Sequence, residues 1–173
     1  LQYVRGMPPL EAGLIILWQP AIMFAGSVLA GRWSDIEEPR LVASLGMAIT
    51  TVGLSAFIFI TPETELVVIV GILIIIGMGY ALFSSPNTNA VMSSVGPKVY
   101  GVASATIGTM RLLGQVFAMG IATVLFAIFI GREEIVPGLH DEFMTAMKVA
   151  FLIFTVLGVI GVRASMARGN LRA

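Results

Sequence analysis

The chain has 173 residues, of which 57% are hydrophobic and only 12% are charged. A soluble domain has about a quarter of its residues charged, so this composition predicts an integral membrane protein instead. Ten basic residues balance ten acidic ones, so the charge favours no nucleic-acid partner. The absence of cysteine excludes disulfides and thiolate metal sites, and a single histidine excludes His-pair zinc motifs. We therefore expect no cofactor and no enzyme.

Five apolar windows are long enough to cross a bilayer as helices, which takes about 20 residues each. In chain order they cover residues 12–30, 41–60, 66–92, 99–130 and 143–162, separated by breaks at 31–40, 61–65, 93–98 and 131–142. No segment keeps the period-2 alternation of a barrel strand. The sequence therefore predicts an all-α bundle of about five transmembrane helices. We treat residues 1–173 as one partial C-terminal transmembrane domain, because the chain opens at Leu1 within an apparent helix end.

The basic residues of the short breaks gather on one predicted side of the bundle. Such residues stay in the cytoplasm. The bias therefore predicts that the break at Gly31, the break at Lys98 and the C-terminus are cytoplasmic, in a multi-pass protein of the cell inner (plasma) membrane. The residues that set this bias are Arg32, Arg40, Lys98, Arg163, Arg168 and Arg172.

The first window contains Trp18, Gln19 and Pro20 near its middle. A proline inside a helix removes one hydrogen bond and kinks the span, which would open backbone beside Gln19. Gln19 is therefore a candidate cavity residue. Trp18 is a second candidate that can stack on a ligand, although packing against lipid or protein is the commoner role of such a tryptophan.

A polar run, Ser84 to Asn89, forms a polar end to the third window and contains Pro86. Two interpretations are open: a broken helix at a binding site, or an ordinary kinked and hydrated helix end. We favour the helix end, because the run lies near the predicted cytoplasmic interface. The nineteen glycines, most of them inside the windows, likewise fit either a moving transporter or plain tight packing.

Arg111 is the only charged residue well inside an apolar window. Burying an arginine in a bilayer costs at least about 2.5 kcal/mol, so its face of the helix should meet the bundle interior or a wet cavity. Two roles stay open: a substrate-cavity cation, assisted by Gln115, or a structural arginine that snorkels. The small or polar residues on its face are Gly101, Ser104, Gly108, Arg111, Gln115, Ala118 and Ala122. No aspartate or glutamate lies within a window, so no proton-coupling acid is evident.

Several short patterns resemble the major facilitator superfamily, most closely its fourteen-helix drug:proton antiporter branch. Gly31, Asp35 and Arg40 resemble the second copy of the cytoplasmic motif G-x-x-x-D-R-x-G-R-R, with Ile36, Glu38 and Pro39 departing from it. Other residues resemble those of the family's helices and loops and follow the same order along the chain. They are Leu1, Gln2, Gly6, Pro9, Ala12, Gly13, Leu14, Pro20, Gly26, Gly77, Gly79, Pro86, Gly101, Ala103, Ser104, Arg111, Gly114 and Ala118.

The resemblance implies the last five helices of the second half of a transporter that rocks two halves around a midplane site. It implies a proton-coupled efflux antiporter for drugs or amphipathic compounds, with the bilayer, the missing N-terminal half and a small amphipathic substrate as partners. Arg111 and Gln115 should then face the missing half with Gln19 nearby, and Asp35 should contact a helix end near Lys98 or Gly101. The alternatives are an exporter of an anionic metabolite, which Arg111 would suit, and a non-transport scaffold or truncated relic.

Overall fold

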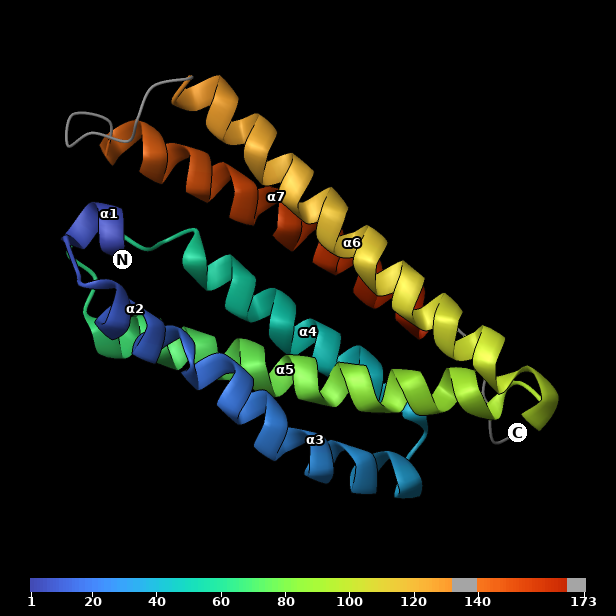
Figure 1. The fold of residues 1–173 in the computed structure, drawn as a ribbon. Coiled ribbons are helices and arrows are strands. Elements are labelled where there is room, and N and C mark those ends of the chain that lie inside the picture. Colours follow the sequence, from blue (N-terminus) through green and yellow to red (C-terminus); the bar gives the residue numbers. More distant parts are fainter. Residues whose placement is uncertain (132–139, 168–173) are drawn as a thin grey trace.

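Antiparallel helices make up the computed structural model, which describes residues 1–131 and 140–167 and leaves the side chains of Tyr3, Asp35 and His140 undescribed. The helices are α1 (Gln2–Arg5), α2 (Pro9–Ile16), α3 (Trp18–Ile36), α4 (Pro39–Phe57), α5 (Leu66–Ser93), α6 (Tyr100–Phe129) and α7 (His140–Met166), with a 3₁₀ turn at Pro97–Val99 (Figure 1). Five helical units, α2 and α3 counting as one, are long and apolar enough to cross a membrane. The all-α class is confirmed, and the described residues contain no strand.

The break predicted to begin at Gly31 is wrong in its extent. The helix α3 runs through Gly31 to Ile36, and only Glu37 and Glu38 separate it from α4. Residues 31–36 contain no proline, and Gly31 continues the helix. The chain leaves helical geometry at Glu37, whose backbone is extended, shortly before Pro39 opens α4.

The predicted proline kink appears as an interruption at Leu17, between α2 and α3. Pro20 has no N–H to donate to the carbonyl of Ile16, so the hydrogen-bond ladder loses a rung one turn before the proline. The bonds on either side remain, from Leu17 N to Gly13 O at 3.0 Å and from Ala21 N to Leu17 O at 3.1 Å. The unit therefore bends at Leu17 while staying continuous.

The helix α4 packs closely against both α5 and α7. A Cβ added at Gly79 would lie 2.5 Å from the Thr50 backbone N, and one added at Gly46 would lie 2.5 Å from the Phe83 backbone N. These close approaches leave no room for a side chain at either position. Small residues at membrane helix interfaces let two helix backbones come this close together. Between α4 and α7, the hydroxyl of Ser44 donates to that of Ser165 at 2.8 Å. For these glycines the packing interpretation is the right one.

The helix α6, by contrast, is covered on very little of its surface. It contacts α7 and meets α5 near one end, and Ala103 is its only buried residue. A Cβ added at Gly101, Gly108 or Gly114 would have no neighbour within 4 Å among the described residues. The small-polar face of α6 is therefore largely uncovered by the described residues, apart from the contact that Arg111 makes with Ser84.

Sidedness gives a direct test of the predicted topology. Glu37 follows α3 and Glu63 lies between α4 and α5, at opposite ends of the bundle (Figure 1), and both are exposed. With cysteines elsewhere in the full-length protein replaced, we expect a membrane-impermeant maleimide to label Glu63→Cys in intact cells. Glu37→Cys should react only after permeabilisation, because the basic residues beside it stay in the cytoplasm. Labelling of both from the same side would refute the topology.

Candidate functional site

The polar run lies in the last third of α5, and its interpretation as a hydrated helix end stays a prediction. The helix continues past Pro86 to Ser93, which places Ser84 about 14 Å before the helix terminus. Pro86 is fully buried, and the hydroxyl of Thr88 donates to the carbonyl of Ser84 at 2.8 Å. Polar side chains thus occur deep in a helix of otherwise apolar sequence.

Two cavities share Ser84, and we call them the Ser84 cavities. The first has a volume of about 390 Å³ and lies between α5 and α6; the second has a volume of about 330 Å³ and lies between α3 and α5. Each falls within the range of about 300–1,000 Å³ that is typical of small-molecule sites. The first is lined by Tyr80, Phe83, Ser84, Asn87, Val91, Thr106, Ile107, Met110 and Arg111, and the second by Met23, Phe24, Ser27, Ala81, Ser84, Ser85, Thr88 and Asn89.

Arg111 reaches this region from α6. Its Nη2 donates to the hydroxyl of Ser84 at 3.5 Å, the length of a weak hydrogen bond, and the side chain is otherwise exposed. A guanidinium carries five N–H donors, of which this contact uses one. Arg111 is also the only charged residue among those that line the Ser84 cavities. The arrangement leaves a planar cation available to a ligand.

Gln19 approaches the face of α5 that carries Ser84, but at a different position along the helix. A Cβ added at Gly77 would lie 2.6 Å from the backbone carbonyl of Gln19, and Gly77 precedes Ser84 by two helical turns. Gln19 therefore reaches α5 about 10 Å along the helix from the point where Arg111 reaches it. Gln19, Met23 and Ser27 follow one another at steps of four on α3, so Gln19 continues the row that lines the second cavity. Gln19 and Arg111 therefore do not meet as expected. Each contacts α5 separately, Gln19 at Gly77 and Arg111 at Ser84.

The other candidate residues lie at the margins of this region. Gln115 is exposed one turn beyond Arg111, and Trp18 is 50% exposed on α3; neither lines a Ser84 cavity. Gly31 lies on α3 close to the polar run, since a Cβ added there would be 3.6 Å from the Ser85 hydroxyl. Arg40 is half-buried in the first turn of α4, and the side chain of Asp35 lies outside the described residues, so its expected contact near Lys98 stays a prediction.

The sequence indicated both Arg111 and the polar run that contains Ser84, but it did not indicate that the two meet. Ser84, Asn87, Thr106 and Met110 line the first cavity, and of these the sequence analysis noted only the polar run. The available signal was the density of hydroxyl and amide side chains on one long apolar helix. This signal carried less weight because the run lies near the predicted cytoplasmic interface.

Comparison with known proteins places the chain among transporters. The model of the family described as Major Facilitator Superfamily matches residues 1–167. The uncharacterized transporter YebQ of Escherichia coli is 29% identical over 159 residues, covering 92% of this chain and 34% of the relative. The riboflavin transporter RibZ of Clostridioides difficile is 26% identical over 133 residues, covering 77% and 28%. The drug efflux pump JefA of Mycobacterium tuberculosis is 31% identical over 130 residues, covering 75% and 25%. The chain thus spans about a quarter to a third of the length of these relatives, and no solved structure matches it.

Proposed function

The chain belongs to the Major Facilitator Superfamily, whose members are transporters and not enzymes, and from this we propose that it is the C-terminal part of an exporter of amphipathic compounds. In this proposal the whole protein is a proton-coupled multidrug or amphipathic-compound antiporter that works by alternating access. It lies in the plasma membrane with its C-terminus in the cytoplasm. The relative named a drug efflux pump supports the export of such compounds.

The observation that carries the proposal is the pair of Ser84 cavities. Their lining mixes aromatic and sulfur side chains, such as Phe83 and Met110, with hydroxyl and amide groups, such as Ser84 and Asn87. An amphipathic compound needs both kinds of contact, since its apolar part must be buried and its polar part must be hydrogen-bonded. A purely structural helix contact would not need either cavity.

The small-polar face of α6 supports the presence of a second half of the transporter that packs against it. Gly101, Ser104 and Gly108 are exposed in this chain, and small residues allow another helix to approach closely. We assign this face to the N-terminal half of the same transporter. The apolar residues that point elsewhere on α6, including Leu112 at 63% and Met119 at 75% exposure, are assigned to the bilayer.

Proton coupling is assigned to residues beyond this chain. Neither of the Ser84 cavities has an aspartate or glutamate among its lining residues. Membrane proton relays use buried carboxylates or histidines. The proposal therefore places the coupling acids in the other part of the transporter.

An alternative is export of an anionic metabolite, and Arg111 is the observation that favours it. A cation in the cavity lining stabilises a carboxylate or phosphate and repels a lipophilic cation. The scaffold alternative is disfavoured, because the relatives are named as transporters.

A larger side chain at Ser84, which lines both cavities, tests the proposal. Ser84→Leu should lower efflux by about tenfold, because the leucine occupies space in both cavities and removes the hydroxyl that Arg111 contacts. The measurement is efflux of cationic and anionic fluorescent amphipathic dyes by cells that express the full-length protein, normalised to folded protein. Ser93→Leu, at the exposed end of the same helix, should leave efflux unchanged. Wild-type efflux in Ser84→Leu would refute the site, and loss for anionic dyes alone would favour the alternative.

A further inference from the structure

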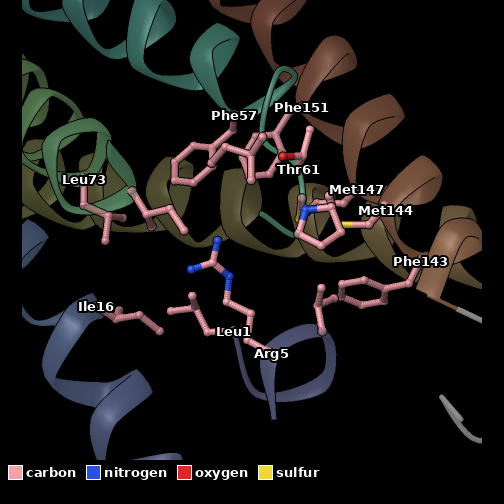
Figure 2. A pocket seen from close by; sticks show the side chains of 14 residues that line it. Leu1, Arg5, Ile16, Phe57, Thr61, Leu73, Phe143, Met144, Met147 and Phe151 are labelled. Atoms are coloured by element: carbon pink, nitrogen blue, oxygen red, sulfur yellow. The ribbon is translucent and has the colours of Figure 1, made fainter. Parts of the chain in front are cut away.

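A second kind of cavity lies at the opposite end of α5. It is bounded by α1, the end of α4, and the first turns of α5 and α7, and it has a volume of about 170 Å³ (Figure 2). We call it the Arg5 cavity. Its lining is Leu1, Val4, Arg5, Ile16, Phe57, Ile60, Thr61, Pro62, Ile69, Leu73, Phe143, Met144, Met147 and Phe151. By the predicted topology this end faces the cell exterior.

The walls of the Arg5 cavity suit a flat apolar ring. The rings of Phe57 and Phe151 stack with their centroids 4.7 Å apart, and Met144 and Met147 add polarisable sulfur beside them. Aromatic rings and thioethers both pack favourably against a further aromatic ring. A cavity of about 150 Å³ with an apolar lining is known to take up benzene, so the volume admits one ring.

Among the residues that the structure describes, Arg5 is the only charged one in this lining. Figure 2 shows its guanidinium extending from α1 into the space among the apolar side chains. Its Nη2 donates to the carbonyl of Thr64, which is the one acceptor it meets among the described residues. The remaining donors of the planar fork match a carboxylate, and the same charge repels an organic cation. Glu63 and Glu65 flank Thr64, but they are exposed and do not line the cavity.

We propose that the Arg5 cavity binds a small aromatic carboxylate, whose ring packs against Phe57, Phe151 and Met147 and whose acid pairs with Arg5. The site is separate from the Ser84 cavities, because Leu73 and Ser84 are about 16 Å apart along α5. It does not depend on the proposed direction or substrate of transport.

The test uses full-length protein in nanodiscs and two fluorinated probes, the acid 4-fluorobenzoate and its neutral counterpart 4-fluorobenzamide. Binding is measured from ¹⁹F line broadening, with empty nanodiscs subtracted to remove partition into lipid. We expect the acid to bind about tenfold more tightly than the amide, because only the acid forms a charge-assisted hydrogen bond. In Arg5→Gln the two affinities should become equal.

Two further variants separate binding from structure. Arg5 also ties α1 to the loop before α5, so its loss can loosen the cavity. Met147→Trp leaves Arg5 in place and fills the space, and it should remove binding of both probes. Arg163→Gln, the matched change at an exposed arginine near the other end of α7 that lines none of the three cavities, should leave both affinities unchanged. An acid preference that survives Arg5→Gln, or one that vanishes in Arg163→Gln, overturns the proposal, as does full binding in Met147→Trp. None of these readouts uses transport, so they fail or succeed independently of the efflux assays.

Discussion

Replacing Gly79 by leucine is expected to prevent the bundle from folding. A Cβ at this position would lie 2.5 Å from both the backbone N and the hydroxyl oxygen of Thr50, and 2.7 Å from the carbonyl of Gly46. Because two of these atoms belong to the α4 backbone, no side-chain rotation relieves the clash, and α4 must move away from α5. Overpacking of a core typically costs about 1–3 kcal/mol, and we expect at least about 3 kcal/mol here.

The matched control is Gly71→Leu, eight residues earlier in the same helix. A Cβ at Gly71 has no neighbour within 4 Å among the described residues, so the leucine has space. The yield of monodisperse full-length protein in detergent and its thermal unfolding midpoint provide the measurement. Gly79→Leu should lose both, while Gly71→Leu should resemble the wild type. Equal behaviour of the two variants would show that the helices are not in contact at Gly79.

Replacing Arg111 by alanine should reduce efflux by about tenfold or more while the protein still folds and inserts. The side chain is exposed in this chain and makes one weak contact, to Ser84, so few of its interactions serve the fold of these helices. A hydrogen bond from a cation to a substrate contributes about 1.5–3 kcal/mol, which sets the scale of the loss. Arg111→Lys should recover efflux only in part, because lysine keeps the charge but lacks the planar fork of donors.

Efflux normalised to folded protein distinguishes this site role from the structural one. A snorkelling arginine predicts lower stability with unchanged transport per folded molecule. Leu112→Ala is the control, since Leu112 is adjacent, 63% exposed and absent from the cavity lining. Normal efflux in Arg111→Ala would end the role of Arg111 in the site.

The fold was predictable because its main determinants are local. Each of the five windows carries enough apolar residues in one stretch to specify a span, and Arg111 stood out because a charge in such a stretch is costly. The ends of the helices were less predictable. Gly31 suggested a loop yet is helical, because packing against neighbouring helices supports residues that local propensity disfavours.

The sites depend on contacts between distant residues, which local patterns do not specify. Ser84 joins two cavities only because α3 and α6 both approach the part of α5 that carries it. Arg5 meets Thr64 across 59 positions in sequence, and nothing near either residue indicates the pairing. The resemblance to a family gave the order of the helices but not these contacts.

The interruption at Leu17 also affects how the chain fits its membrane. The unit Pro9–Ser34 has 26 residues and α5 has 28, so each would measure about 39 Å or more if straight, against a hydrocarbon thickness of about 30 Å. The first unit can match a thinner or thicker bilayer by changing its bend at Leu17. The unbroken α5 adapts by projecting its polar run beyond the hydrocarbon, or by tilting or deforming the lipid at a cost of a fraction of a kcal/mol per Å of mismatch. A tilt of α5 reorients the wall that carries Ser84, so variants at Ser84 and Arg111 are comparable only in lipids of one acyl-chain length.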